Sequence, residues 1–448
     1  MAVQTLNHTP FEPIDPFNNY YSLGFLPPAG YAPYEYTGWR DETQSWKTTC
    51  YLHTGLNPTD TLVLRGPEVI EFLSKVCCTN FTKFPVGMVK HGLMVNEEGT
   101  IIQDGVLMRT AEDEVYTYWM VPALPYVLEK EVHGKFDVTM EYASGKVFLF
   151  QIGGPISFEI LEKVCEISIR DLKHLRFMEN KIAGKTVRIA RLGMAGTLAY
   201  EVHGLIEDAI PVYNEIWGAG QPMGMRRLGA HCYPMNHAEN GYPQTGVHFP
   251  YPKAKEMIDY ILTAEGMDFQ RMTLGAAPKL RGSAGDDANN YFHNPYEFGW
   301  GKMIKFDHEF VGKEALEKIK EDDKRHIVTL EWNAEDVADV FASQFRDEEP
   351  YKYIEEPLDY NIFLGPHHDK VIDKEGKVVG ISFGRQNSAY FHRMISICCL
   401  DKEYEELGTE LELIWGDIDQ RQKRIRVKVA RYPYNNIMRN ETVDVTKL

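Results

Sequence analysis

Cysteine is scarce in this sequence, with seven among 448 residues. None of the seven forms a CxxC pair, and two adjacent pairs, Cys77-Cys78 and Cys398-Cys399, would point to opposite faces of a strand. The pattern argues against a disulfide framework and against a cysteine-based zinc site. We therefore expect reduced, mostly buried thiols, as in a cytosolic protein, and no bound metal.

Long hydrophobic runs and an excess of positive charge are also missing. No stretch of 18 apolar residues is present that could span a bilayer, and the first residues, MAVQTLNHTPFEP, lack the features of a secretory signal. The net charge of −17 argues against a surface that follows nucleic-acid phosphates. We therefore expect a cytoplasmic protein that has neither a membrane nor a nucleic acid as its partner.

What is present is the composition of an ordinary globular chain with many aromatic residues, including 25 Tyr and 22 Phe. Most of these rings are expected in the core, and some suit a pocket for a flat organic ligand. The length predicts two to four domains. The first 45 residues are rich in Pro, Gly and Tyr and are expected to form an irregular arm.

Regular patterning begins at Thr61. Residues 61–66 predict a strand, 67–78 a helix opened by proline, 89–110 a hairpin that turns at Glu98-Gly99, and 115–122 another strand. A second mixed block covers 147–260, with strands at 147–155 and within 187–204 and helices at 156–164 and 209–220. Residues 279–296 are polar and predict a surface excursion. From about 325 the pattern is β-rich, with RQKRIRVKV (421–429) as a strand with one polar face.

Four segments in order resemble the glycine-cleavage T-protein (aminomethyltransferase) superfamily. They are LRGPEVIEFLSKVCCTNFTKFPVGMVKHGLMVNEEGTIIQDGVLMR (64–109), RLGMAGTLAYEVHG (191–204), NPYEFGWGKMIKFDHEFVGKEAL (294–316) and the tail from 378 to 413. The resemblance implies an α+β fold of three domains in a cloverleaf around a channel for reduced folate. It divides the chain into a folate-binding domain (1–60 with 145–270), an α+β domain (61–144), a connecting segment (271–324) and a C-terminal β-barrel-like domain (325–448).

Two further segments, TGWRDETQSWKTT (37–49) and GAHCYPMNHAENGYP (229–243), are similar to the branch that demethylates methoxylated aromatic acids with tetrahydrofolate. The resemblance therefore implies an O-demethylase that moves a methyl group from a small aromatic substrate to the N5 nitrogen of tetrahydrofolate. The alternatives are methylene transfer from a methylenedioxy aromatic, demethylation of a small sulfonium or amine donor, and a folate-binding protein without turnover. The oligomeric state stays open.

Two acids are implied as folate ligands. Glu201 matches the pterin-binding glutamate of the family, and a carboxylate suits the paired N–H donors of a pterin. Read without the resemblance, Glu201 would be a solvent-facing strand residue. Asp104 lies among Ile102, Val106 and Leu107, where an acid needs a partner or a function, and it matches the aspartate that the family places near the reacting nitrogens. Where the family has two adjacent aspartates, this chain has Gln103-Asp104.

Two tyrosines are candidate proton donors. Breaking an aryl ether develops negative charge on the phenol oxygen, which a nearby acid must neutralise. Tyr233 takes the position of a tyrosine in the demethylase branch, and Tyr31 lies on the N-terminal arm, which is a candidate lid. Either residue is equally compatible with a structural role.

The remaining candidates are departures from the family pattern. His231 stands where the T-protein has an arginine near the folate, and Met194 replaces a tyrosine in the same site. Asn57 aligns with a family histidine and His53 lies close to it, so both are assigned to the substrate. These changes make the glycine-cleavage reaction itself a poor match, whereas folate binding is retained.

A benzoate-type substrate needs a cation, and Arg109 at the end of the Asp104 strand is the candidate. The two residues differ by five, so a regular strand would put them on opposite faces unless a bulge intervenes. A surface arginine is the default interpretation. The HCxxxxH segment (231–237) has no standard metal-ligand spacing, and His367-His368 is expected in a solvated turn.

Overall fold

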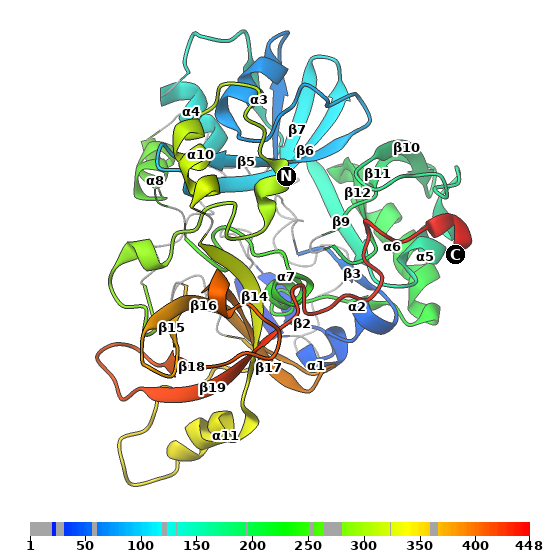
Figure 1. Ribbon diagram of the computed structural model, residues 1–448. Helices are drawn as coiled ribbons and strands as arrows, with labels where there is room; N and C mark the ends of the chain where they lie inside the picture. The colour runs from blue at the N-terminus through cyan, green and yellow to red at the C-terminus, as the bar shows by residue number, and fades with distance from the viewer. Residues whose placement is uncertain are drawn as a thin grey trace.

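The computed structural model describes residues 20–23, 31–55, 61–118, 123–130, 132–193, 196–250, 252, 254–263, 280–322, 324–358 and 366–448. Within these ranges two sheets and a barrel surround the short helix α7 (Tyr233–Asn240), and the chain has the α+β character that was predicted (Figure 1). No helix in these ranges is long and apolar enough to cross a bilayer. A small hairpin, β1 (Tyr20–Leu23) and β2 (Tyr31–Glu35), precedes the first helices.

The first sheet has the order β5-β6-β7-β4-β8. Its strands are β4 (Thr61–Arg65), β5 (Val89–Val95), β6 (Ile101–Ala111), β7 (Glu114–Tyr118) and β8 (Thr139–Tyr142). Helix α3 (Val69–Val76) buries the apolar positions of the predicted 67–78 helix, and α4 (Ala123–Lys130) packs into the same core. The hairpin between β5 and β6 turns at Glu98-Gly99, as expected from the sequence.

The second sheet has the order β10-β11-β12-β9-β3-β13. Its strands are β3 (Tyr51–His53), β9 (Val147–Gly153), β10 (Phe177–Ile182), β11 (Lys185–Ala190), β12 (Ala199–Leu205) and β13 (Arg226–Arg227). One face carries alternate apolar residues such as Phe148, Phe150 and Ile152, which share a core with α5 (Ser157–Val164) and α6 (Ala209–Gly220). The opposite face of the same strands carries polar residues as well as apolar ones such as Tyr51 and Leu149, which share a core with Tyr233.

The C-terminal part is a closed barrel in the order β14-β17-β16-β15-β18-β19. Its strands are β14 (Arg325–Trp332), β15 (Asp369–Ile372), β16 (Val378–Ser388), β17 (Arg393–Asp401), β18 (Glu410–Trp415) and β19 (Lys423–Ala430). Along β19, Ile425, Val427 and Val429 point into the core while the basic residues between them are exposed, which confirms the polar strand face. Helix α11 (Ala334–Ser343), begun by the capping side chain of Asn333, was not predicted.

One expectation about exposure is confirmed in part and another was wrong. In the segment 280–296, Ser283, Ala284 and Tyr291 are buried, whereas Asp286, Asp287 and Asn289 are exposed. His367 and His368 are not in a solvated turn, because they are 8% and 0% exposed and His368 N–H donates to the Arg281 carbonyl. The polar residues of this segment are satisfied inside the protein, where Ser283 donates to Asp369 at the start of β15. The seven cysteines are free and six are buried, as expected.

The remaining helices connect the sheets. They are α1 (Trp39–Glu42), α2 (Ser45–Thr48), α8 (Ala254–Thr263) and α10 (Lys313–Glu321). Strand β3 joins residues 51–53 to the sheet built mainly from 147–205, and the short β13 extends that sheet in parallel. Where one domain ends and the next begins stays a prediction.

Candidate functional site

A cavity of about 300 Å³ lies between the two sheets, α7 and the C-terminal segment. Three of the predicted residues line it: Asp104, Glu201 and Tyr233. Much of the remaining lining is apolar, aromatic or imidazole: Val89, His91, Val106, His174, Leu175, Leu192, His237, Tyr242 and Met303. This size is at the lower end for a cavity that takes a small organic ligand.

Glu201 lies on the face of the second sheet that is turned away from the core of α5 and α6. It is directly opposite Gln151 of β9, which in turn is opposite His53 of β3. The Gln151 Nε2 donates to Glu201 Oε1 at 3.1 Å, and the Gln151 Oε1 bonds the His53 Nδ1 at 2.9 Å. Glu201 is only 5% exposed, so it is not a solvent-facing residue. The row of cross-strand partners fixes the carboxylate and leaves it acceptor positions for a ligand.

Asp104 is held from two sides. Its Oδ2 lies 2.8 Å from His91 Nε2 on the neighbouring strand, and its Oδ1 accepts from the Thr245 hydroxyl at 2.7 Å. The side chain is buried, so the two donors provide the partners that an acid inside an apolar strand requires. The expectation that this carboxylate needs a partner is met by His91 and Thr245.

Tyr233 is the first residue of α7 and is 1% exposed. Its ring stacks on His53, with ring centroids 5.0 Å apart, and meets the edge of His237 at 4.8 Å. Burial lowers the pKa of His53 to about 4 and that of His237 to about 3, so both imidazoles are neutral at physiological pH. The phenol therefore lies in a buried environment without a fixed positive charge on either neighbouring ring.

Two predicted residues point elsewhere. The His231 Nδ1 lies 2.6 Å from Glu35 Oε1, its ring stacks on Tyr34, and it does not line the cavity. Arg109 donates to the carbonyl oxygens of Phe84 and Glu112 and is likewise outside the cavity lining. The irregular register of β6 falls after Arg109, so it does not turn this side chain to the Asp104 face.

Three further candidates cannot be placed at the site. Met194 and Asn57 lie outside the described residues, and for Tyr31 only the backbone, in β2, is described. His53 is described and contacts Tyr233 from behind, so it supports the cavity wall without lining it.

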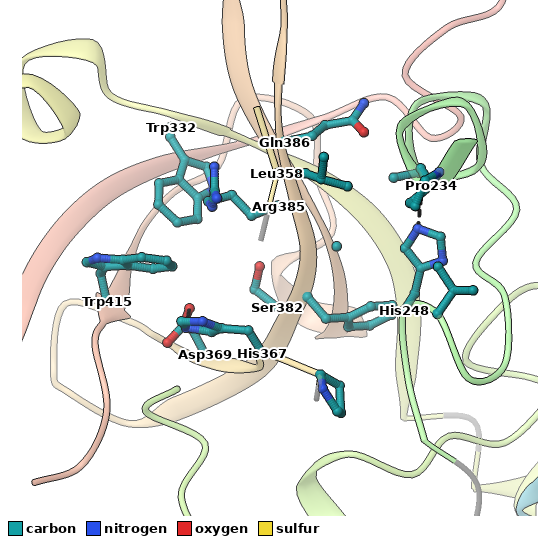
Figure 2. Close-up of a pocket in the computed structure, with 15 residues that line it drawn as sticks. Pro234, His248, Trp332, Leu358, His367, Asp369, Ser382, Arg385, Gln386 and Trp415 are labelled. Carbon is teal, nitrogen blue, oxygen red and sulfur yellow. Dashed lines mark hydrogen bonds and ion pairs between the residues drawn. The ribbon is translucent and has the colours of Figure 1, made fainter. Parts of the chain in front are cut away.

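A second, smaller cavity lies between α7 and one end of the barrel (Figure 2). Trp332, Trp415 and Arg385 are at one side and Pro234 and His248 at the other. Its volume of about 30 Å³ is enough for one or two water molecules and too small for an organic ligand. The cavity of about 300 Å³ is the candidate site because Asp104, Glu201 and Tyr233 line it.

Metal ligation does not account for the histidines near the cavity. His231 bonds Glu35, whereas the His237 Nδ1 bonds the Tyr242 carbonyl, so the two ends of the HCxxxxH segment turn to different partners. Among the described residues, His293, Glu297 and Cys399 bring ligand-type atoms within 4.8 Å of one another, away from the cavity lining.

A family model for the GCVT N-terminal domain matches residues 24–250, and that range contains Asp104, Glu201 and Tyr233. The chain belongs to the glycine-cleavage T-protein superfamily. It is 41% identical over 433 residues to sesamin methylene transferase of Sinomonas sp. (strain No.22), with 94% of each chain covered. It is 30% identical over 436 residues to syringate O-demethylase of Sphingobium sp. (strain NBRC 103272 / SYK-6), with 92% of each covered.

The T-protein fold also agrees with a solved structure. The glycine cleavage system aminomethyltransferase T from Bartonella henselae superposes with a TM-score of 0.66 at 15% identity, covering 94% of this chain and 96% of that one. The superfamily member described here is thus a tetrahydrofolate-dependent one-carbon transferase close to the O-demethylase branch. Its cofactor is tetrahydrofolate and its donor is a small molecule.

The cavity residues suit a reduced folate. The Oε1 of Gln244 is buried at the cavity and has no hydrogen-bond partner among the described residues, so it calls for a donor from a ligand. Glu201 offers acceptors to paired N–H groups, and Asp104 offers a second carboxylate on the opposite sheet. The acceptors on three sides match a pterin, which is rich in N–H donors.

The residues of this site that sequence reasoning missed include His91, Gln151, His237, Gln244 and Thr245. Side chains alternate between the two faces of a strand. If β9 and β12 had been assumed to pair, this alternation could have placed Gln151 beside Glu201. His91 lies inside a quoted family segment, but its contact with Asp104 depends on hairpin register. Thr245 and His237 come from a distant segment, and no local pattern connects them to β6.

Proposed function

We propose that this enzyme transfers the methylene bridge of a methylenedioxy aromatic compound to tetrahydrofolate and releases a catechol. The observation that carries the proposal is the convergence of Glu201, Asp104 and Tyr233 on one mostly apolar cavity. The 41% identity to a sesamin methylene transferase, over 94% of both chains, favours a methylene over a methyl donor.

The reaction requires proton movement that these residues are able to provide. Two C–O bonds of the bridge break, two C–N bonds form, and two protons pass from nitrogens to the two phenol oxygens. When bound, tetrahydrofolate supplies the nucleophilic nitrogens. Glu201 holds the pterin, Asp104 takes up a proton at its carboxylate, and the Tyr233 hydroxyl donates a proton to a leaving oxygen and is reprotonated afterwards.

The charges at the cavity favour a neutral donor. Two cationic side chains line it, Lys90 and Arg439, and both already bind protein acceptors. The Lys90 Nζ donates to the Asn80 carbonyl, while Arg439 donates to the Asn240 carbonyl and to Glu441. Arg109, the cation expected for a benzoate, points away. A donor without a carboxylate therefore matches these contacts better than a benzoate does.

The second candidate is methyl transfer from a methoxylated aromatic compound, in which one C–O bond breaks and one proton moves. The 30% identity to a syringate O-demethylase favours it. The same three residues would serve, because the leaving group is again a phenol oxygen.

The experiment is anaerobic incubation of the purified protein with tetrahydrofolate and a panel of methylenedioxybenzenes, methoxybenzenes, methoxybenzoates, sulfonium compounds and methylated amines, followed by mass spectrometry. The proposal expects a catechol together with 5,10-methylene-tetrahydrofolate. A free phenol with 5-methyl-tetrahydrofolate would establish the second candidate. Tetrahydrofolate binding without turnover of any donor would make the protein a folate binder for this panel.

A further inference from the structure

His91 lies beside Asp104 because of one irregularity in the β5–β6 hairpin. It is directly opposite Val106, and Asp104 is two residues before Val106 on the same face, so the two side chains are diagonal neighbours. The register shifts by one residue between Met94 and Val95. Without that shift His91 would be opposite Gly105, and Asp104 would be on the other face.

Each nitrogen of the His91 ring faces a hydrogen-bond acceptor. Its Nε2 lies 2.8 Å from Asp104 Oδ2, and its Nδ1 lies 3.3 Å from the thioether sulfur of Met303, a weak acceptor. The edges of Tyr242 and Trp300 confine the ring, with centroids 5.4 and 5.2 Å away. The imidazole can therefore hold a proton on each nitrogen without facing a donor.

The chain has lost the second acid that the resemblance implies at this point, since Gln103 precedes Asp104. One carboxylate can take up one proton, whereas release of a methylene bridge moves two from nitrogen to oxygen. An imidazole hydrogen-bonded to that carboxylate supplies the second position. The Thr245 hydroxyl cannot, because it serves only as a donor to Asp104 Oδ1.

We propose that His91 is a positioning residue that fixes Asp104 toward the cavity and stores the second proton of methylene transfer. The two protons from nitrogen neutralise Asp104 and charge His91. Both then leave for the two phenol oxygens, so the pair returns to its starting state. This rests on the proposed function, and it predicts that His91 matters more for a methylene donor than for a methyl donor.

The other titratable groups that face the pair stay neutral. Burial raises the pKa of Tyr242 well above its usual value, with Asp104 adding to the effect. Burial also lowers the pKa of His237 to about 3, aided by the neighbouring His248. Neither Tyr242 nor His237 therefore changes its charge near neutral pH.

The test compares His91→Gln, which keeps an N–H donor for Asp104 but cannot store a proton, with Thr245→Val, which removes a hydrogen bond but no titratable group. We expect His91→Gln to lower kcat for a methylenedioxybenzene about 100-fold, and for a methoxybenzene less than about tenfold. The pH profile of kcat should change shape in His91→Gln and keep its shape in Thr245→Val. The tetrahydrofolate Kd of His91→Gln at pH 7.5 should stay within about threefold of the wild type.

Tetrahydrofolate binding, followed by quenching of tryptophan fluorescence, gives a readout that needs no turnover. In His91→Gln the pH dependence of this affinity should differ in shape from that of the wild type, because the variant lacks one proton-accepting side chain beside Asp104. An unchanged kcat and pH profile would overturn the proposal. So would a Kd weakened more than tenfold at pH 7.5, which would make His91 a direct folate ligand. If the wild type turns over no aromatic ether, the proposed function fails, and the pH dependence of binding still tests the pair.

Discussion

The Tyr233 hydroxyl is the group on which bond cleavage depends, and its ring is fixed between His53 and His237. We expect Tyr233→Phe to lower kcat on an aromatic ether by about 100-fold or more, because the leaving oxygen loses its proton donor. The Kd for tetrahydrofolate should stay unchanged. The matched control is Tyr200→Phe, which removes a buried hydroxyl from β12 of the second sheet, in the core that faces away from the cavity. Equal losses of activity in both variants would contradict the assignment.

Glu201 is expected to carry much of the folate affinity. Glu201→Gln keeps the shape and the partner Gln151 but replaces one acceptor by a donor and removes the charge. Loss of charged hydrogen bonds of about 1.5–3 kcal/mol should weaken tetrahydrofolate binding about 10- to 100-fold in a calorimetric titration. Glu179→Gln, on the exposed edge strand β10, is the control and should bind as the wild type does. Identical affinities for the two variants would rule out Glu201 as the pterin ligand.

Single residues were predictable where a motif and a strand period agreed. Glu201 and Asp104 each lie in a segment that resembles the superfamily, and the structure brings both to one cavity with Tyr233. Arg109 and His231 were chosen because a cation or an aligned position was needed, yet Phe84 and Glu35 provide their partners. An alignment assigns a residue to a position in the chain. The direction of its side chain depends on the hydrogen-bond partners that the fold places around it.

At the scale of elements, most strands and helices of the first two sheets follow from their apolar periods. The exceptions depend on contacts distant in sequence. The one-residue register shift between Met94 and Val95 decides whether His91 lies on the same face of the sheet as Asp104. The amino-acid composition of the hairpin does not predict where this shift occurs. The segment 280–296 has the polarity of a loop, and its exposed middle agrees with that, but Ser283 is buried because its backbone N–H and hydroxyl bond Asp369 of the barrel.

Three elements meet at one buried ion pair. Lys47 of α2 bonds Glu239 of α7, both side chains are 1% exposed, and Glu239 also accepts from Trp46 and from Ser388 of β16. Glu239→Gln leaves the lysine charge buried without a counter-ion, so we expect a loss of about 3–5 kcal/mol in the free energy of unfolding. Urea denaturation measures it. The double variant Lys47→Met with Glu239→Leu should recover part of the loss, and a single variant as stable as the wild type would contradict this role.

For the whole molecule, buried neutral imidazoles predict how stability depends on pH. His248 donates from Nε2 to the Pro234 carbonyl and accepts from the Gln244 N–H, contacts that suit only the neutral ring. Burial lowers the pKa of His248 and of His53 from 6.5 to about 4. The unfolded chain therefore binds more protons between pH 6.5 and 4, and stability falls as the pH falls through that window.

Between pH 7 and pH 5, each of these two imidazoles should remove about 2 kcal/mol from the free energy of unfolding. Urea denaturation at both pH values gives the difference. His248→Gln should show a shallower decline than the wild type. A free energy of unfolding that is constant or rises over this interval would show that the buried rings do not control acid stability.

The central proposal is that the bridging carbon of the donor is transferred to tetrahydrofolate. The most direct measurement is an anaerobic single turnover with tetrahydrofolate and a methylenedioxybenzene that carries ¹³C in its bridge, read by mass spectrometry. We expect the label to be recovered in 5,10-methylene-tetrahydrofolate, in an amount equal to that of the unlabelled catechol. Catechol formed while the label appears as free formaldehyde, or no catechol at all, would contradict it.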